Sequence, residues 1–325
     1  MGITDSIVNY RRFLKRRNLS GHTVKNYINT LKLFVLWLNI PLERVDHKKV
    51  LEYIESLLDR RLAPKTINCH LNSIRRFYDY LHYEEKIIVS NPVRSGCTLR
   101  LPQPLPKYLK DEEVSRFFGV VKGLRDRAMF MLMLRCGLRV EEVANLTIDA
   151  IELDRRKIIV RSGKGYKDRM VYISNDAYDA LGRYLKVRSA KRIKKVFLVE
   201  KGTFKGKPIS VRGIQKRMEY YARKCCVKLS CHHLRHTMAT QLLNADAELA
   251  TIQDLLGHNW ITTTQRYCKV SNLKVQRDYY KAMERITQRH YRSSTLRMAL
   301  TRSGGEQLLR RAMWGPILAT APYLS

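Results

Sequence analysis

Acidic residues and long apolar runs are both scarce in this sequence. Only 29 of its 325 residues are Asp or Glu, against 62 Lys and Arg, and the formal net charge is +33. No uninterrupted apolar stretch reaches the roughly 18 residues that a membrane-spanning helix needs. The first residues also lack the apolar segment of a secretory signal. These absences exclude an acidic protein and a helical membrane protein.

The sequence also lacks a disulfide framework, internal repeats and low-complexity tracts. Its seven cysteines are odd in number and follow no disulfide-rich spacing, so we expect reduced thiols and a cytoplasmic location. Five side chains that can bind metal lie close together in the chain: Cys225, Cys226, Cys231, His232 and His233. Their spacing matches no structural zinc pattern, so we expect no metal site.

The positive charge is the strongest compositional signal. An excess of this size destabilises a compact chain through self-repulsion unless a polyanion relieves it. Because 45% of the residues are hydrophobic, the chain is a folded protein rather than a disordered basic tail. We therefore expect nucleic acid, and not an anionic membrane surface, as the partner.

The first 90 residues predict a helical bundle. Apolar residues recur at three- and four-residue steps over 23–38 and 67–81. Asp46 is placed to cap a third helix between them. The opposite faces carry His70 and five cations that we expect to contact DNA: Lys25, Lys32, Lys65, Arg75 and Arg76.

Helix-breaking residues separate this bundle from the rest of the chain. Residues 91–106 form a linker, because they contain too many breakers for a helix or a central strand: Pro92, Gly96, Pro102, Pro104 and Pro106. We expect one domain at 1–90, a second at 107–290, and a C-terminal extension at 291–325. The chain is long enough for two hydrophobic cores.

The second domain mixes helices with a small sheet. Residues 127–134 predict a buried helix that stops at Gly137. Two β-branched-rich runs, 157–161 and 169–173, flank a Gly-rich segment and predict a hairpin. Helical sequence resumes over 176–288. The expected fold class is therefore mainly α with a small β-sheet (α+β).

Short segments of this domain carry residues suited to binding a phosphodiester. Arg139 follows Gly137-Leu138, and Arg235 lies within a row of histidines. A guanidinium is a rigid fork that stays charged, so two of them can hold the non-bridging oxygens of a phosphate in its transition state. His258 can add a charge-assisted hydrogen bond to a phosphate oxygen.

The same segments provide groups for proton transfer. The Tyr267 hydroxyl can attack phosphorus once a base removes its proton, and His232 is placed to be that base. Lys164 can protonate the departing sugar oxygen, although Lys167 and Arg169 lie in the same turn and the choice of acid stays open. Two other tyrosines near the C-terminus, Tyr279 and Tyr280, are expected to be core or helix-packing residues.

A known family carries six such residues in the same order. Gly-Leu-Arg is followed by an acid three residues later, the next motif is His-x-Leu-Arg-His, and Leu-Gly-His stands nine residues before the tyrosine. The set resembles the tyrosine recombinase (phage integrase) family: Arg139, Lys164, His232, Arg235, His258 and Tyr267. The resemblance covers roughly residues 3–289. It implies a SAM-like N-terminal bundle and a catalytic domain that together form a C-shaped clamp around DNA.

The resemblance also implies the reaction. Such enzymes form a 3′-phosphotyrosyl bond, release a 5′-hydroxyl and pass through a Holliday junction, without ATP, metal or other cofactor. Four protomers act on double-stranded DNA with paired, inverted-repeat core sites, in integration, excision or transposition of a mobile element. Glu142 would orient the site without reacting. The extension at 291–325 would either dock on a neighbouring protomer or be an accessory segment.

Three other functions stay open at this point. A type IB topoisomerase uses the same tyrosine chemistry but only relaxes single duplexes. A catalytically silent homologue would bind DNA without cutting it. A metal nuclease would lose its activity in EDTA.

Overall fold

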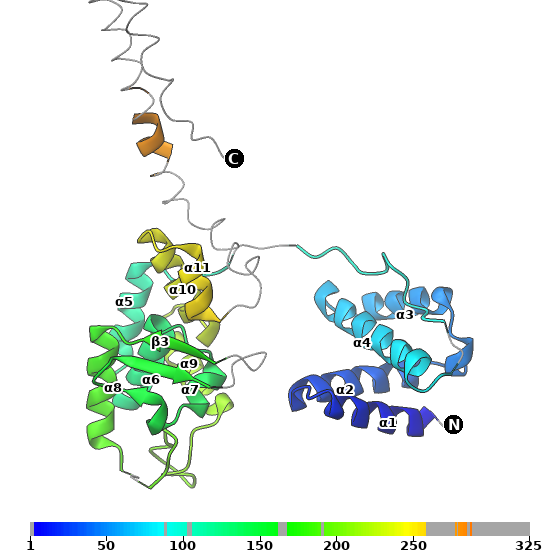
Figure 1. Ribbon diagram of the computed structural model, residues 1–325, viewed down its shortest axis with the longest axis horizontal. Coiled ribbons are helices and arrows are strands. Elements are labelled where there is room, and N and C mark those ends of the chain that lie inside the picture. Colours follow the sequence, from blue (N-terminus) through cyan, green and yellow to red (C-terminus); the bar gives the residue numbers. More distant parts are fainter. Residues whose placement is uncertain are drawn as a thin grey trace, which may run out of the picture. The chain divides into compact units, whose positions relative to one another are not determined.

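The computed structural model describes residues 3–87, 90–102, 106–161, 168–189, 192–257, 277, 279–284 and 287. The chain divides into two compact units, residues 1–104 and 105–325 (Figure 1). Four predicted site residues and the predicted extension at 291–325 lie outside the described residues: Lys164, Lys167, His258 and Tyr267. Among the helices that are described, none is long and apolar enough to cross a membrane.

The described part of the first unit is a helical bundle, as predicted. Its elements are α1 (Ile3–Arg16), α2 (Gly21–Trp37), the 3-10 helix η1 (Leu42–Arg44), α3 (His47–Asp59) and α4 (Pro64–Tyr83). The Asp46 side chain accepts a hydrogen bond from the Lys49 amide at 2.8 Å, which confirms the predicted cap of α3. Ser20 caps α2 in the same way, at 3.1 Å from the Thr23 amide.

Apolar stripes on these helices meet in an aromatic core. The residues predicted to form the stripe of α4 are all buried: Ile67, Leu71, Ile74, Tyr78 and Leu81. Rings from α1, α2 and α3 pack beside them, including Tyr10, Phe34 and Tyr53. The period-3.6 pattern therefore predicted the buried faces of α2 and α4.

His70 does not lie on the exposed basic face, and that prediction was wrong. Its ring is buried and shares a hydrogen bond of 2.9 Å with the Tyr53 hydroxyl. Residue 70 stands three positions after Ile67 and one before Leu71, which places it within the apolar stripe. Burial and the positive charge of Arg60 lower the pKa of His70, so the ring is neutral at pH 7.

The second unit places a small sheet among helices. Its described elements are α5 (Asp111–Val120), α6 (Leu124–Arg135), α7 (Val140–Asn145), the 3-10 helix η2 (Ile148–Ala150), β1 (Ile151–Glu152), β2 (Lys157–Val160), β3 (Arg169–Tyr172), α8 (Asn175–Val187), α9 (Val211–Lys224), α10 (Cys231–Asn244) and α11 (Leu249–Leu256). The sheet is antiparallel in the order β1-β2-β3. The predicted hairpin is confirmed by β2 and β3, in which Val160 pairs with Arg169.

Two features of this unit differ from the prediction. Strand β1, which is only two residues long, was not predicted. Helix was predicted across residues 176–288, but residues 192–210 are irregular and include an isolated bridge between Leu198 and Pro208. Gly202 and Gly206 in this stretch have φ values of +84° and +80°, which turn the chain out of any helix.

Helix α6 is the centre of the second core, as predicted. Every residue from Ala128 to Leu134 is buried, and the helix packs against α8 and α10. The helix ends at Arg135, and the turn at Gly137 that follows leads directly to Arg139.

Candidate active site

A glycine turn sets the position of Arg139. Gly137 has φ +63°, and a Cβ there would lie 2.6 Å from the Met238 Sδ atom. Glycine adopts this left-handed conformation without strain, and any larger residue would also have to displace the Met238 side chain. Arg139 then becomes the N-cap of α7, and the Glu142 carboxylate accepts its backbone amide at 2.7 Å. Gly-Leu-Arg-x-x-Glu is therefore a turn followed by a helix cap.

Glu142 joins two guanidinium groups. Its Oε1 accepts Nη1 of Arg139 at 2.8 Å, and Arg169 binds both carboxylate oxygens at 2.7 Å each. Burial alone would raise the pKa of Glu142, but the hydrogen bonds and charges of Arg169 and Arg139 lower it to about 2. Glu142 is thus a carboxylate at any ordinary pH and does not transfer protons, which supports the predicted orienting role.

Arg235 is held by backbone oxygens. Arg235 lies in α10 and is only 3% exposed, and its guanidinium donates to the carbonyls of Gly137 and Leu256. These contacts join the end of α6 to the end of α11. Because a buried guanidinium needs such partners, its orientation is fixed before any substrate binds.

The C-terminal end of α11 is where the arginines converge. Three successive carbonyls each accept a hydrogen bond from a different guanidinium: Leu255 from Arg169 at 2.9 Å, Leu256 from Arg235, and Gly257 from Arg139 at 3.1 Å. The last carbonyls of a helix have no partner within the helix and carry partial negative charge. We call Arg139, Arg169 and Arg235 the arginine cluster.

Gly257 is required by this arrangement. Its φ of +58° ends α11 in the left-handed conformation. A Cβ at this position would lie 2.9 Å from the Cδ atom of Arg169. The glycine of Leu-Gly-His therefore serves both the helix end and the close approach of Arg169.

His232 is suited to accept a proton. It stands in the first turn of α10, and its ring stacks on that of His236 with centroids 5.7 Å apart. Partial burial lowers the pKa of His232, and the charges of Arg235 and Arg139 lower it further. The imidazole is therefore neutral at pH 7, which is the form that a general base needs.

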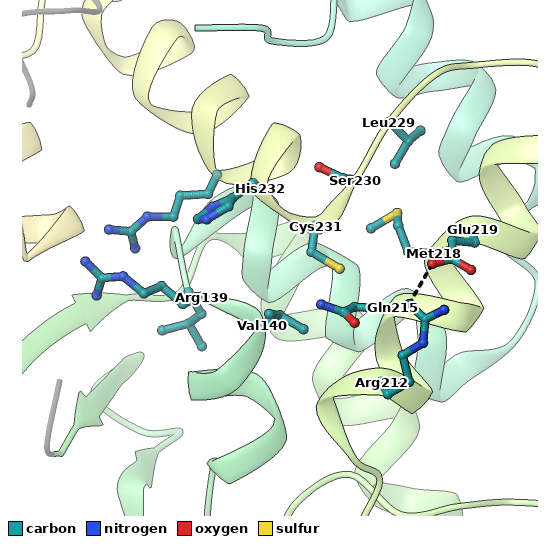
Figure 2. A pocket seen from close by; sticks show the side chains of 12 residues that line it. Arg139, Val140, Arg212, Gln215, Met218, Glu219, Leu229, Ser230, Cys231 and His232 are labelled. Atoms are coloured by element: carbon teal, nitrogen blue, oxygen red, sulfur yellow. Dashed lines mark hydrogen bonds and ion pairs between the residues drawn. The ribbon is translucent and has the colours of Figure 1, made fainter. Parts of the chain in front are cut away.

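A pocket of about 290 Å³ opens between these groups and α9. Arg139 and His232 lie at one end of it, and Arg212 and Glu219 form an ion pair of 3.1 Å at the other (Figure 2). Arg235 also lines the pocket. Two guanidinium groups and a neutral imidazole thus face one cavity, an arrangement that can bind a phosphate and remove a proton beside it.

The structure brings four of the predicted site residues together: Arg139, Glu142, His232 and Arg235. Arg169 was predicted only as an alternative to Lys164 for the acid, whereas its guanidinium binds Glu142 and the Leu255 carbonyl. The sequence did contain evidence for this role. Side chains alternate between the two faces of a strand, so Arg169 lies on the same face as the buried Val171, two residues later. An arginine on the inward face of a strand needs a buried acceptor.

The cysteine and histidine stretch forms no metal cluster in the part of the chain described here. Cys225 and Cys226 follow the end of α9, and Cys231 begins α10. Burial raises the pKa of the Cys231 thiol to about 11, so it is protonated at pH 7.

The two C-terminal tyrosines differ from expectation. Tyr279 and Tyr280 are 57% and 60% exposed, and their rings contact each other with centroids 5.5 Å apart. The prediction that they are core residues was wrong, although both lie in a helical segment as expected. They share a helical segment in which every residue with a described side chain is exposed.

The depressed pKa of Glu142 predicts a pH-dependent stability. The pKa of Glu142 is about 2 in the folded protein and 4.5 in the unfolded chain. The charged carboxylate therefore stabilises the fold above pH 4.5, and this contribution is lost as the pH falls towards 2. We expect Glu142→Gln to lower the free energy of unfolding by about 3 kcal/mol at pH 7. Urea unfolding of both proteins should show this difference shrinking towards zero near pH 2, and a difference that is constant with pH would contradict the assignment.

Sequence and structure comparisons agree with this geometry. The sequence model of the phage integrase family matches residues 107–274, and that of the phage integrase N-terminal SAM-like domain matches residues 7–85. The chain is 34% identical over 286 residues to the tyrosine recombinase XerC of Myxococcus xanthus, an alignment that covers 82% of this chain and 93% of the relative. It is 30% identical over 284 residues to XerA of Thermococcus kodakarensis, covering 86% and 96%.

A solved structure shares the fold. The Tn1549 transposon integrase, in complex with transposon right end DNA, aligns with a TM-score of 0.71 at 18% identity, over 86% of this chain and 99% of that one. With the paired family matches and the curated relatives, this similarity leads to one conclusion. The chain belongs to the phage integrase family and is a tyrosine-type site-specific recombinase.

Proposed function

We propose that this recombinase cuts and rejoins DNA through a 3′-phosphotyrosyl bond at Tyr267. The observation that supports this most directly is the pocket shared by Arg139, Arg235 and the neutral His232. A phosphodiester seated there would meet two fixed cations and a proton acceptor. Neither ATP nor a metal or cofactor is needed, because the ester to tyrosine keeps the energy of the broken bond.

In the proposed cleavage step, His232 takes the hydroxyl proton of Tyr267 and the phenolic oxygen bonds to phosphorus. The bond from phosphorus to the 5′ oxygen breaks, and Lys164 gives that oxygen a proton. Arg139, Arg235 and His258 bind the non-bridging oxygens as their charge grows. Rejoining reverses the step, with a 5′-hydroxyl from the partner duplex as the nucleophile. The alternative acid is Lys167, from the same segment.

The proposed assembly follows from two cuts on each of two duplexes. Four protomers would bind double-stranded DNA with paired, inverted-repeat core sites and pass through a Holliday junction. Within each protomer, a SAM-like domain at 1–90, a linker at 91–106 and a catalytic domain at 107–290 would close as a clamp around DNA. The extension at 291–325 would contact a neighbouring protomer. We place the protein in the cytoplasm.

For the biological role we propose integration, excision or transposition of a mobile element. The alternative is resolution of replicon dimers, which uses the same chemistry. The relatives named XerC and XerA and the Tn1549 transposon integrase all share the family. Target sites that flank the gene of this protein would support the mobile element, and a single site elsewhere in the chromosome would support dimer resolution.

Covalent capture tests the proposed function without a known target. The full-length protein is incubated with a pool of randomised DNA duplexes, denatured and washed, and the DNA that stays attached is sequenced. A recombinase should enrich a paired, inverted-repeat site and then exchange the ends of two marked duplexes that carry it. Relaxation without exchange would indicate a type IB topoisomerase. Binding without attachment would indicate a catalytically silent homologue.

The exposed cations of the first unit should carry part of the DNA affinity. Lys25, Lys32, Lys65 and Arg76 are exposed, whereas Arg75 is half-buried and donates to the carbonyls of the linker. Each phosphate contact contributes about −0.9 to the slope of log affinity against log salt. We expect Lys25→Gln with Lys32→Gln to reduce this slope by about 2 in a binding titration. The matched Lys25→Arg, Lys32→Arg variant should keep the wild-type slope. An unchanged slope in the glutamine variant would show that these two lysines do not contact DNA phosphates.

A further inference from the structure

Arg169 connects three parts of the active site. It is the first residue of β3, its Nη atoms bind both oxygens of Glu142, and its Nε atom donates to the Leu255 carbonyl of α11. Its side chain is only 8% exposed. A two-point contact of this kind fixes the direction of the guanidinium as well as its distance from the carboxylate.

The position of Arg169 in the chain gives these contacts a functional meaning. Val160, the last residue of β2, pairs with Arg169 across the hairpin. Arg169 therefore stands at one end of the connecting segment, which contains Lys164 and Lys167. Glu142 in turn binds Arg139, and Leu255 lies three residues before His258. The Arg169 guanidinium therefore links three parts of the site. It follows the segment with the proposed acid, it reaches Arg139 through Glu142, and it binds α11, after which the chain continues to His258 and Tyr267.

We infer that Arg169 is a positioning residue, which places the proton donor of the β2–β3 segment against the phosphate bound by Arg139. The inference rests on the proposed function, since it needs a leaving oxygen that a lysine protonates. Arg169 is not itself the acid, because a guanidinium does not release its proton in a protein. Arg139 also binds Glu142 and the end of α11, through the Gly257 carbonyl, but it lines the pocket, whereas Arg169 begins the strand that follows the lysine-containing segment.

A positioning role differs measurably from a structural role. A DNA substrate with sulfur in place of the bridging 5′ oxygen releases a thiolate, which leaves without being protonated. Such a substrate suppresses any defect in proton donation. A variant that is merely less folded would cleave the oxygen and sulfur substrates equally poorly, so the ratio of the two rates would stay at its wild-type value.

The experiment measures this ratio in single-turnover cleavage of the captured duplex. Arg169→Gln should slow cleavage of the oxygen substrate by about 100-fold, the effect of a displacement of about 1 Å at a reacting group. The ratio of the cleavage rate of the sulfur substrate to that of the oxygen substrate should rise by the same factor. The same rise is expected in one of the two lysine variants, Lys164→Ala or Lys167→Ala, namely the one that removes the acid. If Arg169→Gln does not fold, Arg169→Lys, which keeps the charge but lacks the fork, provides the same ratio.

Arg161, directly after the other strand of the hairpin, offers a matched control. It follows β2 directly, and its exposed guanidinium contacts only Asp149 among the described residues, at 3.4 Å. Arg161→Gln makes the same charge change and should keep the wild-type rates. A wild-type ratio in both Arg169 variants would overturn the positioning role. A wild-type protein that forms no covalent adduct would overturn the proposed function, and the role of Arg169 with it.

Discussion

Tyr267→Phe is expected to abolish covalent attachment to DNA while leaving DNA affinity unchanged. The substitution removes one oxygen atom and keeps the ring, so contacts that depend on shape or charge are preserved. Loss of the nucleophile in a covalent enzyme lowers the rate by on the order of 10⁶-fold. Denaturing gel electrophoresis of the protein with the captured duplex should show the adduct in the wild type and none in the variant.

The exposed tyrosines provide the controls. Tyr279 and Tyr280 are open to solvent and are the nearest chemical rivals among the described residues towards the C-terminus. Tyr279→Phe and Tyr280→Phe should both keep the adduct. Buried tyrosines are poor candidates, since burial raises the pKa of Tyr53 to about 12 and deprotonation becomes harder. An adduct that survives Tyr267→Phe, or a DNA-linked peptide that lacks residue 267, would assign the nucleophile to another residue.

Local pattern predicted much of the fold. The stripe of α4 and the buried helix α6 follow from the 3.6-residue period and from an unbroken apolar run. The hairpin of β2 and β3 follows from two β-branched runs around a glycine-rich turn. In these elements the sequence and the tertiary packing favour the same structure, so the sequence alone is sufficient.

Prediction failed where tertiary contacts decide the conformation. Helix was predicted across residues 192–210 although Gly202, Gly206 and Pro208 interrupt them, and the three hydrogen bonds that Arg188 donates, to the carbonyls of Ile193, Lys195 and Val196, stabilise an irregular path there. His70 was predicted on the basic face opposite the apolar stripe, yet its ring is buried and shares a hydrogen bond with the Tyr53 hydroxyl inside the bundle. A buried partner of this kind has no signature in a local window.

The active site shows the same division. The sequence specifies residue types and spacings, and from these Arg139, Arg235, His232 and Glu142 were predicted as site residues, but not the contacts of Arg169. It does not reveal that Arg139 and Gly257, 118 residues apart, are joined by a hydrogen bond. The carbonyls of α11 hold the arginine cluster, and backbone acceptors have no residue type that a motif could specify. The two glycines of the motifs are the nearest sequence evidence, since both permit those carbonyls to be reached.

Arg235→Ala is expected to cause the largest loss among the phosphate-binding groups. Removing a single preorganised donor to a developing oxyanion typically costs about 10²- to 10³-fold in rate. Arg235 is also buried, so the variant leaves the Gly137 and Leu256 carbonyls without the donor shown here. An unsatisfied buried carbonyl costs about 1–3 kcal/mol, so we expect a lower melting temperature together with the lost rate.

Two further variants separate the chemical loss from the structural one. Arg235→Lys keeps the charge but cannot reach two carbonyls with one fork, so it should recover DNA affinity and little of the cleavage rate. Arg212→Ala removes an exposed arginine from the wall of the same pocket and should change stability by no more than about 0.5 kcal/mol. Single-turnover rates, melting temperatures and DNA affinities are compared for all three. If Arg235→Ala cleaves DNA as fast as Arg212→Ala, then the buried guanidinium holds the fold and does not bind the phosphate in the transition state.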